Sequence, residues 1–220
     1  MIITIDGPAA AGKGTLAQQL AEKYRLAYFD TGMVYRAVGL ELLNAGLAPD
    51  DETAAEEVAR SLTFAKMHLL SRQPGFRSAA GGQAASKVAA IPEVRKILLK
   101  MQQDFALNPK SPEGENMNGV VYDGRDTGTV VCPGADIKFF ITASPEVRAM
   151  RRHKEYLQKG MASDYDDVLA QTKERDQRDS SRASAPLKPA EDAVIIDTSS
   201  MDIAEVFAEA CRIIEAKHSN

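Results

Sequence analysis

Met1-Ile-Ile-Thr-Ile-Asp-Gly-Pro-Ala-Ala-Ala-Gly-Lys-Gly-Thr15 is the stretch that decides the fold. Its first six residues form a short apolar run of the kind found in a buried strand. A loop bounded by Gly7 and Gly12 follows, and then apolar residues such as Leu16 and Leu20 recur at helical spacing. A strand, a glycine-bounded loop and a helix in this order are the context that a phosphate-binding loop requires.

The chemistry of this loop fits the binding of a nucleotide phosphate. Its glycines let the backbone bend so that consecutive N–H groups point inward, and the opening of the helix adds its positive dipole end. Lys13 can reach the outer phosphates, and Thr15 can offer its hydroxyl to a magnesium ion. The predicted donor contacts are Gly7, Pro8, Ala9, Ala10, Ala11, Gly12, Lys13, Gly14 and Thr15. The alternative is an ordinary glycine-rich turn between a strand and a helix.

Composition limits the partners that the chain can have. With 220 residues, 44% of them hydrophobic and 26% charged, we expect one globular domain. The net charge of −4 argues against nonspecific binding of nucleic acid, so local arginine clusters must meet an anionic substrate. The two cysteines are too few for a disulfide framework. No secretory signal is recognisable and nothing approaches the ~20 apolar residues of a membrane span, so we expect a cytoplasmic monomer.

Strands and helices alternate along the chain, which predicts an α/β fold with a parallel sheet covered on both faces. Further apolar runs at 26–29, 120–123, 137–141 and 194–196 complete the predicted strands, and helices are expected at 14–24, 32–46, 49–60, 92–107, from 145 and from 202. Ligands of such sheets bind beyond the carboxyl ends of the strands. Asp30 and Asp123 end two of these strands, so either can hold the water shell of a magnesium ion or simply cap its strand.

Two segments interrupt this alternation. Residues 61–90 contain turn signals and only short apolar stretches, which predicts an insertion outside the sheet. Residues 108–118 are polar and rich in proline and glycine, which predicts a mobile loop. The predicted core is therefore 1–60, 91–157 and 185–220.

Residues 174–182 carry the second strong pattern. If they are helical, Arg175, Arg178, Asp179 and Arg182 fall within an arc of about 100°. Guanidinium groups on one stripe repel each other unless an anion lies among them. The alternative is a solvated helix with Glu174–Arg178 and Arg175–Asp179 pairs, each worth only ~0.2–0.5 kcal/mol. Beside a phosphate-binding loop, a lid at about 158–184 that closes over two phosphorylated substrates is the favoured interpretation.

Taken together, the segments resemble one family, the bacterial cytidylate kinases among the P-loop nucleoside monophosphate kinases. The Gly-Lys-Gly-Thr ending of the loop, where Gly14 separates Lys13 from Thr15, already resembles these kinases. The other matching segments are Asp30-Thr31-Gly32 with Tyr35-Arg36, Ala85 to Ala90 with Pro92 and Arg95, Asp123 to Val131, and Glu174 to Arg182 with Ala185-Pro186-Leu187. The resemblance implies a P-loop kinase with a central parallel five-stranded sheet, an acceptor-binding insertion and a lid. It also implies transfer of the terminal phosphoryl group of ATP to CMP or dCMP with Mg²⁺, giving CDP or dCDP in pyrimidine nucleotide metabolism.

The resemblance also assigns roles to matching residues. Thr31, Arg36, Arg125 and Arg182 are similar to the acceptor-phosphate contacts, Arg175 and Asp179 to sugar contacts, and Ser86, Arg95 and Asp126 to the base-reading group. The implied catalytic set is Lys13, Arg125, Arg178 and Arg182; Arg151 joins the donor contacts, and Thr15, Asp30 and Asp123 are the metal candidates. Asp126 has an alternative role, in which it only pairs with Arg125 or Arg36.

Some departures and competing functions stay open at this point. The 61–80 segment is shorter than usual for the family and 108–118 is longer. A related P-loop kinase that acts on UMP or AMP would share most of these features. A GTP-dependent switch would usually carry an Asn-Lys-x-Asp loop, which this sequence lacks. A noncatalytic binding module is disfavoured by Lys13, Thr15 and the arginine stripe.

Overall fold

A five-stranded parallel sheet forms the centre of the computed structural model, which describes residues 1–111 and 114–218. The strands are β1 (Ile2–Asp6), β2 (Ala27–Asp30), β3 (Val120–Gly124), β4 (Ile137–Thr142) and β5 (Val194–Asp197), in the order β2-β3-β1-β4-β5. All the predicted strands are confirmed to within about two residues, as is their parallel pairing. The register aligns Asp30 with Asp123 and Asp6 with Gly124, so these residues share the carboxyl edge of the sheet.

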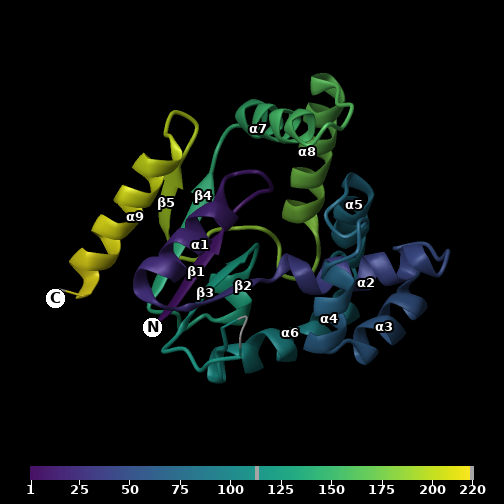
Figure 1. Ribbon diagram of the computed structural model, residues 1–220, viewed down its shortest axis with the longest axis horizontal. Coiled ribbons are helices and arrows are strands. Elements are labelled where there is room, and N and C mark those ends of the chain that lie inside the picture. Colours follow the sequence, from purple (N-terminus) through teal and green to yellow (C-terminus); the bar gives the residue numbers. More distant parts are fainter. Residues whose placement is uncertain (112–113, 219–220) are drawn as a thin grey trace.

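Helices surround this sheet (Figure 1). They are α1 (Lys13–Tyr24), α2 (Gly32–Asn44), α3 (Glu52–Ser61), α4 (Phe64–Ser71), α5 (Ala79–Val88), α6 (Pro92–Leu107), α7 (Pro145–Gln158), α8 (Tyr165–Ser181) and α9 (Ile203–His218). A short π-helical turn, η1 (Thr127–Val131), follows β3. Figure 1 shows α9 at one end of the molecule, α2 to α5 at the other, and α7 with α8 above the sheet.

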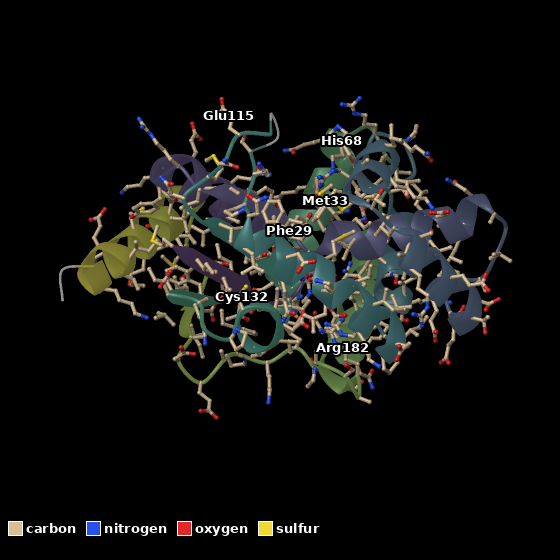
Figure 2. The ribbon with its side chains drawn as sticks, turned by 90° about the horizontal axis from the view of Figure 1, so that it is seen from below. Phe29, Met33, His68, Glu115, Cys132 and Arg182 are labelled. Atoms are coloured by element: carbon tan, nitrogen blue, oxygen red, sulfur yellow. The ribbon has the colours of Figure 1, made fainter. Side chains whose placement is uncertain are left out.

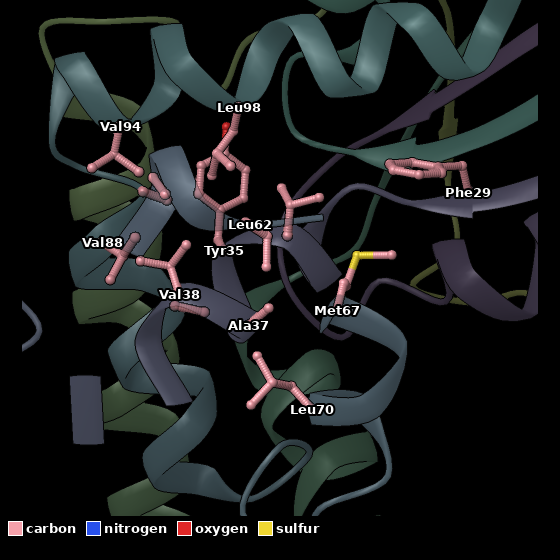
Figure 3. Packing of buried hydrophobic residues seen from close by; sticks show 14 of the residues in the cluster. Phe29, Tyr35, Ala37, Val38, Leu62, Met67, Leu70, Val88, Val94 and Leu98 are labelled. Atoms are coloured by element: carbon pink, nitrogen blue, oxygen red, sulfur yellow. The ribbon is translucent and has the colours of Figure 1, made fainter. Parts of the chain in front are cut away.

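Alternation along β3 shows why both faces of the sheet are covered. Val120 and Tyr122 point into one apolar cluster, which also contains residues of α2 to α6, and Figure 3 shows part of it. Val121 points to the opposite face, into a second cluster made mainly with α1, β4 and α9. Successive side chains of a strand face opposite ways, so one strand supplies both cores.

The 61–90 segment adds no strand to the sheet, as predicted, but it contains the two helices α4 and α5. Helix α5 lies close against α2, because Gly39 leaves no side chain there; a Cβ at that position would come within 3.0 Å of Ala84. Buried side chains of α4 and α5, such as Met67, Leu70 and Val88, belong to the same cluster as those of α2 and α6 (Figure 3). Helices α2, α4, α5 and α6 therefore pack together around one apolar cluster on this face of the sheet.

The loop and the cysteines complete the fold. Residues 108–118 fold back on themselves through a bridge between Lys110 and Asn116, while 112–113 of the predicted loop lie outside the described residues. In Figure 2, Glu115 points outward from this loop. Cys132 and Cys211 are free and buried. Within 1–111 and 114–218, no helix combines the length and apolarity that crossing a membrane requires.

Candidate active site

The phosphate-binding loop is shaped by residues with a left-handed backbone. Gly7 has φ 144°, and a Cβ there would lie 1.9 Å from the carbonyl oxygen of Ile141, so only glycine fits. Gly12 has φ 94° and is the N-cap of α1, and Ala10 also has a positive φ of 61°. These turns curl the backbone between β1 and α1 around the opening of the helix. The predicted order of strand, loop and helix is confirmed, and it forms a site suited to anions.

Lys13 is held at the base of this loop. Its side chain is buried, and Nζ donates to the carbonyl oxygen of Pro8 at 3.0 Å and lies 3.6 Å from Oδ1 of Asp123. Burial, followed by the neighbouring charge of Arg125, lowers the pKa of Lys13 to about 8. An anion bound in the loop would favour the charged ammonium, so the lysine is placed to respond to a phosphate.

A cavity of about 420 Å³ opens beside the loop at the carboxyl edge of the sheet. Its walls come from the loop, the ends of β2 and β3, and helices α2, α5, α6, α7 and α8. All the predicted substrate-binding residues line it: Thr31, Arg36, Ser86, Arg95, Arg125, Asp126, Arg175, Asp179 and Arg182. Residues more than a hundred positions apart in the chain thus share one concave site.

One end of the cavity holds the predicted base-reading group. Asp126 forms a buried ion pair with Arg95 of α6, rather than with Arg125 or Arg36. Arg95 also donates to the carbonyl oxygen of Ala89 at 3.1 Å, and its guanidinium lies 5.4 Å from the ring centroid of Tyr35. Ser86 is buried, and its hydroxyl has no hydrogen-bond partner among the described residues. A free hydroxyl next to an oriented charge pair is suited to a small polar ligand.

Several arginines give the cavity a strongly basic character. Asp179 is buried, and its Oδ2 accepts from Nε of Arg125 at 3.0 Å and lies 3.8 Å from Nε of Arg175. Burial, followed by the charge of Arg125, lowers the pKa of Arg175 to about 9. Nε of Arg175 and Nη2 of Arg182 are buried without a hydrogen-bond partner in the described chain. Figure 2 shows Arg182 at the end of α8, beside other nitrogen-bearing side chains. This excess of buried positive charge favours binding of an anion.

Five of the predicted site residues do not line this cavity: Gly7, Pro8 and Ala11 of the phosphate-binding loop, Arg178 and Arg151. Arg178 donates to Oε1 of Glu174 at 2.6 Å and to Oε1 of Gln83 at 3.3 Å. Both ion pairs of the solvated-helix alternative are therefore present, but Asp179 is buried in the cavity, so its pair with Arg175 is not solvated. Arg151 donates to both Oγ1 and the carbonyl oxygen of Thr198, at 3.0 and 2.6 Å. It lines a second cavity, of about 850 Å³, on the other side of the phosphate-binding loop.

Sequence reasoning missed some residues of the main cavity. Arg77 and Arg152 line it and add to its positive charge, and Tyr28 closes it near Asp30. Arg152 belongs to an arginine-rich helix, which is a recognisable signal, but no motif marks Arg77. Arg77 is brought in by the turn between α4 and α5, and that placement depends on tertiary packing.

The metal candidates also meet at the carboxyl edge of the sheet. The paired strands place Asp30 beside Asp123, and burial, followed by the charge of Asp123, raises the pKa of Asp30. Asp30 also accepts from the backbone N–H of Gly32 at 2.9 Å, as a strand-end cap would. Among the described residues, no group of three or more His, Cys, Asp or Glu side chains could hold a metal alone. One or two carboxylates with a hydroxyl from Thr15 suit Mg²⁺, which takes its remaining ligands from phosphates and water.

Comparisons with known proteins agree with this geometry. A family model described as cytidylate kinase matches residues 3–216. A cytidylate kinase from Paramagnetospirillum magneticum is 52% identical over 216 residues, covering 98% of each chain. One from Xanthobacter autotrophicus is 50% identical over 219 residues, covering 100% of this chain and 99% of its own. The crystal structure of an uncharacterized protein from Eubacterium ventriosum shares the fold, with a TM-score of 0.52 and 14% identity over 100% of this chain and 99% of its own.

Proposed function

The chain belongs to the cytidylate kinase family, and from this membership we propose how its residues carry out the family's reaction. The protein is an ATP-dependent kinase that transfers the terminal phosphoryl group of ATP to CMP or dCMP, giving CDP or dCDP in pyrimidine nucleotide metabolism. The observation that carries this proposal is the meeting of the predicted acceptor contacts in one cavity beside the phosphate-binding loop.

The donor occupies the loop and the second cavity. The main-chain N–H groups of the loop bind its phosphates, except at Pro8, which has none, and Arg151 lies in the second cavity, into which the rest of the nucleotide extends. Lys13 neutralises the charge that grows on the transferring group. Phosphoryl transfer needs little covalent help and much alignment and charge neutralisation, which a buried ammonium supplies without reorganisation.

The acceptor phosphate lies among the arginines of the main cavity. Thr31, Arg36, Arg125 and Arg182 contact it. Arg175 and Asp179 contact the sugar. Binding of CMP supplies partners for the buried guanidinium atoms that lack them, the phosphate for Arg182 and the sugar for Arg175. Arg178 assists from outside the cavity by orienting the end of the stripe.

The base lies at the end formed by Ser86, Arg95 and Asp126. The carboxylate of Asp126 accepts from the exocyclic amino group of cytosine, as acidic side chains do when they read this base. Arg95 and Ser86 donate to the cytosine acceptors N3 and O2. The Arg95–Asp126 pair holds both partners in place before the base arrives. Uracil would place its O4 lone pairs against the carboxylate, which disfavours it.

Mg²⁺ accompanies ATP in this proposal, with Thr15 as a ligand and Asp30 and Asp123 holding its water shell. When bound there, the ion would supply charge neutralisation for the phosphates of the donor. The half-buried carboxylates of Asp30 and Asp123 lie side by side and support this assignment, because a cation would relieve their mutual repulsion.

The wider organisation follows from the same premise. We assign about 61–90 as the acceptor-binding insertion and about 158–184 as a lid, within a single kinase domain of 1–220. A monomer suffices, because one chain supplies all the proposed contacts. A cytoplasmic location fits ATP and CMP as substrates.

Acceptor profiling tests the proposal. The wild-type protein is assayed with ATP and each of CMP, dCMP, UMP and AMP, and Asp126→Ala is assayed in parallel. CMP and dCMP should be preferred, and Asp126→Ala should lower the CMP-to-UMP ratio of kcat/KM by roughly ten-fold or more, the worth of one base contact. Asp104→Ala, an exposed carboxylate on α6 paired with Lys100, is the control. Preference for another acceptor would refute the substrate assignment, and an equal fall for both bases would make Asp126 structural.

A further inference from the structure

Asp6, the last residue of β1, faces away from the phosphate-binding loop that begins at the next residue. Its side chain is 4% exposed and lies against η1, which follows β3. Oδ1 accepts from both the backbone N–H and the hydroxyl of Thr127 at 2.8 Å, and Oδ2 accepts from the N–H of Gly128 at 2.7 Å. One buried carboxylate thus ties the start of the donor loop to the turn that follows the acceptor residues Arg125 and Asp126.

The fit between these segments is close. A Cβ on Gly124, the residue aligned with Asp6 across the sheet, would lie 2.4 Å from the methyl group of Thr127. A Cβ on Gly128 would lie 2.8 Å from the hydroxyl oxygen of Thr4 and 3.4 Å from Oδ2 of Asp6. Side chains are absent at both glycines, so the turn can sit directly on the end of β1. Asp6 therefore helps to fix its position, together with Val131 at the other end of η1, which packs in the first apolar cluster.

Asp126, which carries the base-reading carboxylate, is the N-cap residue immediately before η1. The carbonyl oxygen of Asp126 accepts from the N–H groups of Val130 and Val131, at 2.8 and 3.2 Å, which closes the π-helical turn. Single π turns are uncommon and are found frequently at functional sites. A shift of this turn would move Asp126 relative to Arg95, its partner on α6.

Burial of Asp6 carries a cost that the contacts must offset. Desolvation, with a smaller effect of the negative charge of Asp126, raises its pKa to about 6 against the effect of the donors from Gly128 and Thr127. A buried acid near a second acid is unfavourable for folding alone.

We propose that Asp6 is a positioning residue that fixes the acceptor-reading turn 125–128 relative to the phosphate-binding loop, and so sets acceptor affinity and base choice. It touches neither nucleotide and acts through Thr127 and Gly128. This role rests on the proposed function, because it presupposes that Asp126 reads the base.

The test compares Asp6→Asn with a pair of variants at its partner. Asp6→Asn keeps the shape of the side chain but replaces one carboxylate oxygen, an acceptor, by an NH2 group, a donor. This NH2 group would face the backbone N–H of Thr127 or Gly128, which is also a donor. Thr127→Val removes only the hydroxyl donor, and Thr127→Ser keeps it. Ile196→Val, in the second core and far from the turn, controls for a general loss of stability. The readouts are KM for CMP, the CMP-to-UMP ratio of kcat/KM, and the dissociation constant of ATP measured alone.

For Asp6→Asn we expect KM for CMP to rise about ten-fold and the CMP-to-UMP ratio to fall by a similar factor, as for a lost hydrogen bond to a charged group. The affinity for ATP alone should change less than about two-fold, since the donor loop keeps its own glycines. Thr127→Val should shift the same quantities by a smaller factor. Thr127→Ser and Ile196→Val should keep the wild-type ratio.

Opposite results would overturn the proposal. If Asp6→Asn lowers turnover with both bases equally, or weakens ATP as much as CMP, Asp6 only supports the fold. If that variant does not fold, Thr127→Val decides, and a wild-type ratio in that variant rejects the role. If the wild-type protein does not prefer CMP, the proposed function is refuted. That outcome does not depend on the variants, so it is distinguishable from failure of the role of Asp6.

Discussion

The phosphate-binding loop and the acceptor cavity differ in which part of the chain recognises phosphate. The loop is one continuous segment, 7–15, and it presents main-chain N–H groups whose direction is set by positive φ angles at Gly7, Ala10 and Gly12. The acceptor cavity is lined by side chains from many elements, and arginines dominate its charge. A main-chain site is shaped before the ligand arrives, whereas a side-chain site depends on how its charges are balanced.

The charges show this contrast most clearly. In the loop, Lys13 is already held by the carbonyl oxygen of Pro8 and by Asp123. In the cavity, Asp179 is shared between Arg125 and Arg175, and buried guanidinium atoms of Arg175 and Arg182 remain without partners in the described chain. We infer that the donor site is ready to bind, while the acceptor site holds a charge imbalance that the substrate phosphate relieves.

Removal of Lys13 should have the largest effect on this contrast. Lys13→Ala should lower kcat by about a hundred-fold or more, on the scale of losing one preorganised donor that stabilises transition-state charge. The dissociation constant of CMP should change far less, because the lysine acts on the transferring group. Steady-state kinetics and CMP titration measure the two quantities. Near-normal turnover in Lys13→Ala would contradict the proposed role of the phosphate-binding loop in catalysis.

The pH dependence of kcat/KM for ATP should report the protonation state of Lys13. The pKa of Lys13 in the free enzyme is lowered to about 8, so the ammonium is present below that pH and lost above it. We expect kcat/KM for ATP to fall as pH rises through 8, by about ten-fold for each further unit. Lys13→Arg keeps its charge at these pH values and should flatten the decline, whatever its absolute rate. A wild-type profile that stays level to pH 10 would contradict the assignment.

Sequence reasoning was most successful where recognition is local. The 7–15 loop and the five strands were predictable, because glycine positions and apolar runs dictate them directly. The convergence of Ser86, Arg95 and Asp126 was expected from family resemblance alone. Their pairing was not expected, since the partner of Asp126 depends on how α6 packs against β3. The hydrogen bonds of Asp6 and the entry of Arg77 into the cavity likewise depend on tertiary packing, for which the sequence carries no local signal.

The proposed lid at about 158–184 lies over the acceptor cavity, and hydrogen exchange can measure whether a bound ligand orders it. Near the middle of α8, Asp176 accepts from Arg148 of α7 at 2.9 and 2.5 Å, while Arg148 also donates to the carbonyl oxygen of Ala9. The end of α8 instead carries the crowded arginines. A bisubstrate analogue at about ten times its dissociation constant should slow exchange across the lid roughly ten-fold, if opening releases the ligand. Helix α9 should be unaffected. Equal protection without ligand would reject the lid.

Asp179 offers the smallest and most specific test of the charge balance. Its carboxylate is buried between Arg125 and Arg175, so it can orient both guanidinium groups and also accept from a sugar hydroxyl. Asp179→Ala should harm CMP and dCMP together, because the arginines lose their common partner.

The ratio between these two substrates isolates the sugar contact. One neutral hydrogen bond is worth about 1 kcal/mol, so the CMP-to-dCMP ratio of kcat/KM should change by a few-fold. Asp166→Ala, an exposed carboxylate in the first turn of the same helix, should leave the ratio at its wild-type value. If Asp179→Ala lowers both activities and keeps the ratio, then Asp179 acts only on the arginines, and the sugar is recognised by another residue of the cavity. If it changes the ratio alone, the arginines are held by their remaining contacts, and the charge imbalance of the acceptor site is smaller than these ion pairs suggest.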